Sequence, residues 1–326
     1  MKFEKVRWGI IGCGDVTEVK SGPAFQKVEN SELVAVMRRT GELAKDYAKR
    51  HNVPKWYDDA DALINDPDVD AVYIATPPGS HKEYTIKVAK AGKPVYVEKP
   101  MALNFVECNE MIAACKEARV PLYVAYYRRA QPRFVKIKDL LESKVIGDVR
   151  FVSTTQYQKA SEDVKDSKSL PWRLQPEVSG GGLFFDLASH TLDILDFLLG
   201  PIKEAQGFAS NQAGYYRAED IVTGTYRFES GIHGVGKWCF SAFENVDVNE
   251  IVGSKGKITF STFGDEPIVL TTTSGKEQWS FERPQHVHQP LAETIMAELT
   301  GNYGQCPSNG VNGARTNWVM GELVKR

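Results

Sequence analysis

The sequence has few cysteines, and their spacing excludes the usual cysteine-built sites. The five cysteines form no Cys-x-x-Cys pair and are odd in number. We therefore expect neither a disulfide framework nor a zinc ribbon, and we predict no metal site. Reduced cysteines are typical of the cytoplasm, so a cytoplasmic protein is the expectation.

Net charge and long apolar runs are lacking as well. The chain carries 40 lysines and arginines against 42 aspartates and glutamates, for a net charge of −2. This balance argues against nucleic acid as a general partner and against binding to an anionic membrane by charge. No apolar stretch approaches the roughly 18–20 residues of a membrane span. The first residues run from a charged start into a strand-like segment, so we expect no signal peptide.

The remaining composition is that of an ordinary globular protein. Hydrophobic residues make up 42% and charged residues 25% of the 326 residues, which is enough to build a sizeable core. At roughly 150 residues per domain, the length predicts two domains.

The first 125 residues alternate short apolar runs with helix-length polar segments. The runs are nearly continuous, as expected of parallel strands that helices cover on both faces. Repeated strand–helix order predicts an α/β Rossmann domain, a doubly wound parallel sheet, over residues 1–123. The expected strands are 6–11, 32–37, 70–75, 94–98 and 121–125, and the expected helices are 41–51, 58–65, 80–91 and 104–118.

The pattern changes after about residue 125, where strand-like stretches separated by turn residues become frequent. We expect residues 124–326 to form an α+β domain with a large, mostly antiparallel open sheet between roughly 149 and 282. The C-terminal helix is expected to pack back toward the first domain. The expected strands are 149–158, 202–210, 219–228, 232–240, 246–252, 256–262 and 267–273, and the expected helices are 132–142, 183–199, 291–300 and 311–325.

A glycine-containing turn follows the first strand directly. Gly12 permits a tight turn, and Gly14 lets backbone N–H groups approach a pyrophosphate at the start of a helix. Thr17 stands where the full G-x-G-x-x-G pattern has its third glycine, and a plain strand–turn–helix connection is the alternative interpretation. The expected dinucleotide contacts come from Gly12, Cys13, Gly14, Asp15 and Val16.

The end of the second strand bears on the choice of cofactor. An acidic residue about 20 positions beyond the glycines favours NAD, but no acid occurs between residues 33 and 41. Arg38 and Arg39 stand there instead, and an arginine can bind the additional phosphate of NADP through paired hydrogen bonds. The sequence therefore favours NADP over NAD. The alternative interpretation is that both arginines are simply solvated at the start of a helix and bind no phosphate.

Three motifs carry a resemblance to a known family. They are Ala75–His81 (ATPPGSH), Val95–Ala102 (VYVEKPMA) and Gly180–His190 (GGGLFFDLASH). In this order they resemble the glucose–fructose oxidoreductase / inositol dehydrogenase (Gfo/Idh/MocA) family, over essentially the whole chain. Pro171–Arg173 (PWR), ahead of the glycine run, is similar to the 1,5-anhydrofructose reductase-like members. Those reductases have an Asn-His-His stretch where this chain has Ala125–Arg129 (AYYRR), so the substrate is not carried over.

The resemblance implies an NAD(P)-binding first domain and a second domain whose open sheet often mediates oligomerisation. We therefore expect a homodimer or homotetramer and a sugar- or polyol-like substrate. The implied cofactor contacts beyond the glycine turn include a loop under the cofactor, the helix start that follows it, and aromatic and charged groups near the nicotinamide. These are Thr76, Pro77, Pro78, His81, Glu98, Lys99, Trp172 and Arg173.

Three residues fit the chemistry of carbonyl reduction or its reverse. Lys99 follows a parallel strand at the sheet edge where ligands collect, and it can stabilise charge on the substrate oxygen. Asp186 and His190 are four residues apart, so on a helix they share one face, and His190 can exchange the proton. Taken singly, a lysine at a strand end is usually a solvated surface residue, and Asp186 is explained as an acid in a first helical turn, stabilised by the helix dipole.

Two further histidines, His286 and His288, would share a face if they lay on a strand. No cysteine or acid cluster accompanies them, and we interpret them as solvated loop residues rather than metal ligands.

The predicted function is that of an NADP-dependent oxidoreductase acting on a sugar, polyol or related hydroxy/keto compound. A dihydrodiol dehydrogenase of the same family is one alternative, and a non-catalytic dinucleotide-binding sensor is another. A sensor has no chemical need for Lys99, Asp186 and His190 together.

Overall fold

The computed structural model describes residues 2–162, 164 and 170–325, which form two compact units. The first unit comprises residues 1–131 and 284–314, and the second comprises 132–283 and 315–326. Within the described ranges, every helix is too short or too polar to span a bilayer.

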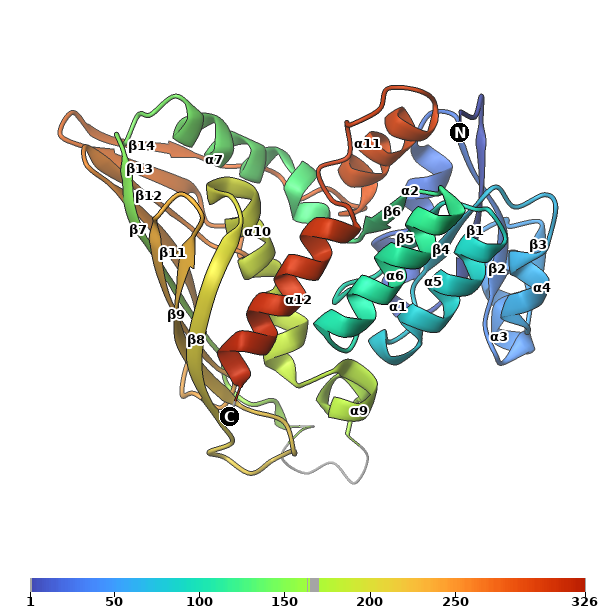
Figure 1. Cartoon of the computed structure of the whole chain (residues 1–326), viewed down its shortest axis with the longest axis horizontal. Coiled ribbons are helices and arrows are strands. Elements are labelled where there is room, and N and C mark those ends of the chain that lie inside the picture. The colour runs from blue at the N-terminus through green and yellow to red at the C-terminus, as the bar shows by residue number, and fades with distance from the viewer. Residues whose placement is uncertain (1, 163, 165–169, 326) are drawn as a thin grey trace. The chain divides into compact units, whose positions relative to one another are not determined.

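The first unit is built on a six-stranded parallel sheet (Figure 1). Its strand order, β3-β2-β1-β4-β5-β6, is that of Rossmann dinucleotide-binding folds. All five strand pairings are parallel, which confirms the predicted doubly wound sheet. The strands are β1 (Val6–Ile11), β2 (Ser31–Met37), β3 (Lys55–Tyr57), β4 (Ala71–Ile74), β5 (Val95–Val97) and β6 (Leu122–Val124).

Strand β3 lies outside the prediction. It has only three residues, and its central side chain, Trp56, is 41% exposed. The segment therefore carries no apolar run by which a buried strand is recognised.

Helices cover both faces of this sheet, which is why its strands are apolar at almost every position. On one face, Trp8 and Tyr73 pack with Phe25 and with Leu291. On the other face, Val72, Val95 and Val97 belong to a separate core. The helices of the unit are α1 (Asp15–Val19), α2 (Gly22–Lys27), α3 (Gly41–Arg50), α4 (Ala60–Ile64), α5 (His81–Lys90), α6 (Phe105–Ala118) and α11 (Gln289–Leu299).

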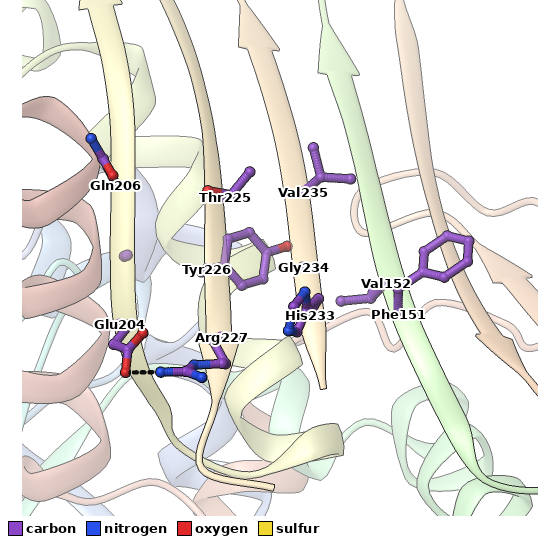
Figure 2. Close-up of a pocket in the computed structure, with 11 residues that line it drawn as sticks. Phe151, Val152, Glu204, Gln206, Thr225, Tyr226, Arg227, His233, Gly234 and Val235 are labelled. Carbon is purple, nitrogen blue, oxygen red and sulfur yellow. Dashed lines mark hydrogen bonds and ion pairs between the residues drawn. The ribbon is translucent and has the colours of Figure 1, made fainter. Parts of the chain in front are cut away.

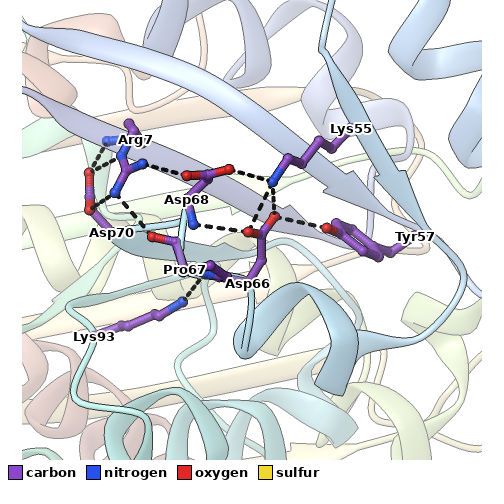
Figure 3. A network of polar contacts seen from close by, with 8 residues as sticks. All are labelled: Arg7, Lys55, Tyr57, Asp66, Pro67, Asp68, Asp70 and Lys93. Carbon is purple, nitrogen blue, oxygen red and sulfur yellow. Dashed lines mark hydrogen bonds and ion pairs between the residues drawn. The ribbon is translucent and has the colours of Figure 1, made fainter.

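A charged network joins the amino ends of β1, β3 and β4 (Figure 3). The Arg7 guanidinium donates to both carboxylate oxygens of Asp70, at 2.9 and 2.8 Å. Lys55 Nζ donates to Asp66 at 2.9 Å, and the Tyr57 hydroxyl donates to the same carboxylate at 2.8 Å. This network fixes the end of the sheet opposite to the edge where ligands bind in such folds.

The second unit contains an eight-stranded sheet of order β14-β13-β12-β11-β7-β10-β9-β8. Among the described strands of this sheet, only β7 and β10 pair in parallel, so the predicted mostly antiparallel sheet is confirmed. The strands are β7 (Val149–Tyr157), β8 (Ile202–Ser210), β9 (Ile221–Phe228), β10 (His233–Cys239), β11 (Val246–Gly253), β12 (Gly256–Phe260), β13 (Ile268–Thr272) and β14 (Gly275–Trp279).

One face of this sheet is buried and the other is open. The buried face packs against Ile137, Leu195 and Met320, which come from three helices. The open face carries exposed apolar side chains such as Phe208 and Val235, which are 81% and 47% exposed. The helices are α7 (Pro132–Glu142), α9 (Pro176–Ser179), α10 (Ser189–Leu199) and α12 (Gly310–Val324), of which α12 belongs to this unit from residue 315 onward.

The single helix predicted over 183–199 has a different form. It begins with a π-helical segment, Phe184–Ala188, and continues as α10. Over five residues the apolar pattern of a π-helical turn is indistinguishable from that of an α-helix, so the sequence did not show the change. Such segments occur frequently at functional sites.

Candidate active site

The glycine turn lies against the carboxyl ends of β2 and β4. The amides of Gly12 and Cys13 both donate to the Met37 carbonyl, at 2.9 and 3.1 Å. Gly12 has a φ of +93°, and a Cβ there would lie 2.8 Å from Thr76 Cγ2 and 3.0 Å from the backbone carbonyl carbon of Ala75. The fold itself therefore requires glycine at position 12.

Gly14 is different, because the protein leaves space around it. A Cβ at this position would meet no neighbouring atom closer than the Gly12 carbonyl oxygen, at 3.9 Å. Gly14 precedes Asp15 and Val16 at the start of α1, where unpaired helix amides can bind phosphate. At the third glycine position, the buried Thr17 hydroxyl donates to the Gly14 carbonyl at 2.8 Å. These residues fit a pyrophosphate that approaches the backbone closely at Gly14.

Both arginines after β2 are exposed, and one of them reaches the glycine turn. Arg38 Nη1 lies 3.5 Å from the carbonyl oxygen of Cys13. Burial raises the pKa of the Cys13 thiol to about 11, so this side chain stays neutral near neutral pH. The structure thus puts a fixed positive charge beside the turn expected to hold the dinucleotide.

His81 begins α5, as expected, but its ring nitrogens contact backbone carbonyls of the protein itself. The side chain is fully buried. One ring nitrogen lies 2.7 Å from the Thr76 carbonyl, and the other lies 3.1 Å from the Pro100 carbonyl. Burial lowers its pKa, although the carbonyls partly oppose the shift. His81 therefore ties the loop of Thr76, Pro77 and Pro78 to the segment after β5, and any contribution to cofactor binding passes through that loop.

Glu98 and Lys99 stand at the carboxyl end of β5. Glu98 is only 7% exposed, and its Oε1 accepts a 2.5 Å hydrogen bond from the Tyr73 hydroxyl. Its Oε2 accepts the backbone N–H of Lys99 at 3.1 Å. The Lys99 side chain is half-buried. Glu98 thus fixes the turn that carries Lys99.

The interpretation of His286 and His288 as solvated loop residues is wrong. They are only 6% and 1% exposed, because the segment before α11 returns to the first unit. His286 contacts the Val19 carbonyl at 2.6 Å and Lys27 Nζ at 2.7 Å. His288 contacts the Tyr96 hydroxyl at 3.0 Å. No local sequence signal shows that a loop so distant in the chain packs beside β5.

The stretch that departs from the reductase pattern is mostly buried. Tyr126 is 0%, Arg128 8% and Arg129 3% exposed. The Arg128 guanidinium stacks on the Tyr127 ring at 5.0 Å, and Arg129 donates to the Pro307 carbonyl at 3.2 Å. These arginines follow β6, the strand next to β5.

The second unit contains four of the expected site residues. Asp186 lies in the π-helical segment and His190 in the first turn of α10. Four residues make slightly less than one π-helical turn, so both stay near one face. Arg173 Nε lies 3.4 Å from Asp186 Oδ2, and the Arg173 guanidinium stacks on the Trp172 ring at 4.5 Å. His190 is 5% exposed, with its ring edge toward Phe263.

No group of three or more histidines, cysteines or acids with metal-binding geometry occurs among the residues that the structure describes.

Comparison with known sequences places the chain among oxidoreductases. Residues 6–126 match a family described as an oxidoreductase family with an NAD-binding Rossmann fold, and residues 134–259 match the GFO/IDH/MocA C-terminal domain. Oxidoreductase P35 of Formosa agariphila is 42% identical over 305 residues, which cover 93% of this chain and 94% of that protein.

Two further relatives have more specific names. The 1,5-anhydro-D-fructose reductase of Ensifer adhaerens is 27% identical over 318 residues, 94% of this chain and 92% of its own. The trans-1,2-dihydrobenzene-1,2-diol dehydrogenase of Xenopus laevis is 32% identical over 291 residues, 87% of this chain and 83% of its own.

Solved structures share the fold. An aldose-aldose oxidoreductase from Caulobacter crescentus, in complex with glycerol, has a TM-score of 0.85 at 26% identity, covering 96% of this chain and 95% of that one. Levoglucosan dehydrogenase, in complex with NADH and levoglucosan, has a TM-score of 0.84 at 22% identity, covering 98% and 96%.

Proposed function

Because the chain belongs to the Gfo/Idh/MocA family of NAD(P)-dependent oxidoreductases, we propose that it oxidises or reduces a sugar, polyol or related hydroxy/keto compound with NADP. Residues 1–123 would bind the cofactor, and residues 124–326 would supply substrate contacts and the oligomer interface. The observation that carries the proposal is the pairing of a cofactor turn with Lys99 at the carboxyl edge of the same sheet.

Arg38 supports NADP as the cofactor. Its guanidinium lies beside the glycine turn at the end of β2, where the adenosine ribose binds in Rossmann folds. No acidic residue stands at this strand end to bind the ribose hydroxyls of NAD or to repel a 2′-phosphate. The contacts proposed for the rest of the cofactor are those of the glycine turn, the Thr76–Pro78 loop, Glu98, Trp172 and Arg173.

The proposed chemistry divides among three side chains. The nicotinamide, when bound, exchanges the hydride with the substrate carbon. Lys99 holds a positive charge at the substrate oxygen and stabilises it as negative charge develops. His190 gives a proton to that oxygen or takes one from it, and Asp186 favours the protonated imidazole. The roles of Lys99 and His190 could be exchanged, because both side chains carry protons.

A dihydrodiol dehydrogenase is the second candidate, supported by the relative from Xenopus laevis. The test of both is a substrate panel of 1,5-anhydro-D-fructose, myo-inositol, levoglucosan and trans-1,2-dihydrobenzene-1,2-diol with NADP(H) and NAD(H). Turnover of a sugar or polyol supports the first function, and turnover of the cyclic diol alone supports the second. Cofactor binding without turnover of any panel member would favour the non-catalytic sensor.

The open face of the second sheet supports a homo-oligomer as the assembly. Phe151, Phe208, Val235 and Val248 all expose apolar surface there, and exposed apolar patches mark interaction sites. The same face is hollowed by about 680 Å³ beside Phe151 and Val235 (Figure 2). A second copy of the chain is the proposed occupant, giving a homodimer or homotetramer.

Compartment is the last part of the proposal. All five cysteines are free thiols in the structure, which supports a reducing compartment such as the cytoplasm.

A further inference from the structure

His288 lies in a buried polar cluster of the first unit that no step of the proposed reaction uses. The cluster lies next to Lys99 at the carboxyl ends of β4 and β5. It consists of Tyr73, Tyr96, Glu98 and His288, with the Tyr127 ring against the imidazole at 4.6 Å. His288 lies 192 residues beyond Tyr96 in the chain, and its backbone N–H donates to the Lys20 carbonyl at 3.2 Å.

The surroundings decide the charge of the imidazole. Complete burial, followed by the positive charges of Lys20, Lys99 and Arg128, lowers the pKa of His288 to about 3. We therefore expect a neutral ring near neutral pH, in which one nitrogen carries a proton and the other a lone pair.

The neighbours then decide which nitrogen carries the proton. Nδ1 faces the Tyr96 hydroxyl at 3.0 Å, and a hydroxyl can either donate or accept. Nε2 faces Glu98 Oε1 at 3.5 Å, and a carboxylate can only accept. A lone pair on Nε2 would be repelled by the carboxylate, whereas a proton there is attracted to it. The favourable arrangement has Tyr96 donating to Nδ1 and the proton on Nε2, where it attracts the Glu98 carboxylate at 3.5 Å without completing a hydrogen bond.

A buried carboxylate needs such donors to remain ionised. The Tyr73 hydroxyl and the Lys99 amide each donate to Glu98, and the imidazole adds a third favourable dipole. Removing that dipole raises the cost of the charge on Glu98 and loosens the carboxylate that holds the Lys99 backbone.

We infer that His288 is a positioning residue for the reaction: its neutral imidazole, protonated on Nε2, holds the Glu98 carboxylate that fixes Lys99. The inference rests on the proposed role of Lys99. Misplacement of a reacting group by about 1 Å costs up to 10²-fold in rate. Loss of His288 is therefore expected to lower kcat by roughly 10-fold to 100-fold, while KM and cofactor Kd change little.

The first experiment is ¹⁵N NMR of the histidine side chains in the full chain, with His288→Gln to assign the signals. A neutral ring with the proton on Nε2, unchanged from pH 5.5 to 9, is the expected result. A ring that titrates in this range, or one that carries its proton on Nδ1, overturns the inference. This experiment requires neither a substrate nor an apolar substitution at position 288.

The second experiment compares kcat in three histidine variants, using NADPH and the panel compound that the enzyme turns over. His288→Leu removes both polar contacts, and His288→Gln keeps one donor and one acceptor and should recover most of the lost kcat. His286→Gln is the control, because His286 is also buried but contacts Val19 and Lys27 rather than Glu98. A His288→Leu protein with the kcat of the His286 control overturns the inference.

A matched tyrosine pair covers the case in which His288→Leu does not fold. Tyr73→Phe removes the hydroxyl on Glu98 and should lower kcat in the same way. Tyr123→Phe removes a buried hydroxyl from a different carboxylate, Glu298 at 3.2 Å, and should not. Equal kcat in the two variants overturns the role of the cluster.

Lys99→Met separates failure of this inference from failure of the proposed function. If Lys99→Met keeps full turnover, the proposed role of Lys99 is wrong. If Lys99→Met loses turnover and His288→Leu does not, only the positioning role is wrong.

Discussion

The proposed preference for NADP rests on Arg38, because it lies against the glycine turn while no acid occupies the end of β2. Arg38→Asp should weaken NADPH binding roughly 10-fold to 100-fold, since a hydrogen bond to a charged group contributes about 1.5–3 kcal/mol. NADH binding should change much less. Fluorescence titration with both cofactors measures the difference, and Lys49→Asp, an exposed change elsewhere on the same domain, is the control. Equal affinity for NADPH before and after the substitution would show that the phosphate binds elsewhere.

The residues of the proposed site were predictable from sequence only where a motif carried them. Lys99, Asp186 and His190 stand in two of the family motifs, so the amino-acid sequence alone is enough to name them. The contact between His288 and Tyr96 could not be predicted in this way, because the two residues lie 192 positions apart in the chain and no motif contains both. Arg173 was predicted as a cofactor contact, and the structure adds its ion pair with Asp186.

The turn between β1 and α1 is the element proposed to bind the cofactor phosphates, and its two glycines make opposite predictions. Gly12→Ala forces a side chain into positive φ and into contact with Thr76, so it should destabilise the fold by about 1–3 kcal/mol. Gly14→Ala meets no close neighbour and should leave the free energy of unfolding nearly unchanged. It should nevertheless weaken NADPH binding, because the new methyl group occupies the space left for the pyrophosphate. Urea unfolding and NADPH titration of both variants provide the test, and a Gly14→Ala protein with normal affinity would contradict the proposed phosphate position.

A second prediction concerns the network at the amino ends of the strands. Burial raises the pKa of Asp66, but hydrogen bonds from Lys55, Tyr57 and a backbone amide outweigh it and lower the pKa to about 2. The usual value is about 3.9, so the ionised carboxylate stabilises the folded state above that pH, and the contribution disappears as pH falls from about 4 to 2.

Asp66→Asn should therefore lower the free energy of unfolding at pH 7 by about 1–3 kcal/mol and have progressively less effect toward pH 2. Urea unfolding between pH 2 and 7 measures this, with Asp58→Asn as an exposed control. A difference from wild type that stays constant across this range would rule out the proposed linkage.

At the level of elements, apolar periodicity predicted most of the architecture. The near-continuous runs of β1, β2 and β4 reflect helices on both faces of the sheet, and the alternation in β7 reflects a sheet covered on one face. Strand β3 is too short for such a pattern. Strand β14 is mostly exposed and polar, and it lies at the sheet edge. Its extended conformation therefore depends on pairing with β13 more than on an apolar pattern in its own sequence.

For the whole molecule, the open sheet face predicts self-association. Replacing Phe208 and Val235 with aspartate puts charge on the apolar face without disturbing the buried side of β8 or β10. The double variant should be monomeric in light scattering, whereas the wild type should be a dimer or tetramer. Val106→Asp changes an apolar position on α6 whose 66% exposure lies between those of Phe208 and Val235, and it should keep the wild-type mass. A wild-type monomer would refute the oligomer, and an unchanged mass in the double variant would place its interface elsewhere.

The central claim is that this oxidoreductase acts through Lys99 and His190. The most direct measurement is the rate of change of absorbance at the NADPH band with the substrate panel, for wild type, Lys99→Met and His190→Ala, across pH. The account predicts turnover of a sugar or polyol by the wild type and a loss of about 10²–10⁴-fold in His190→Ala with NADPH binding intact. It predicts a comparable loss in Lys99→Met. Near-normal turnover and an unaltered pH profile in His190→Ala would contradict the assigned proton transfer, and full turnover in both variants would contradict the account as a whole.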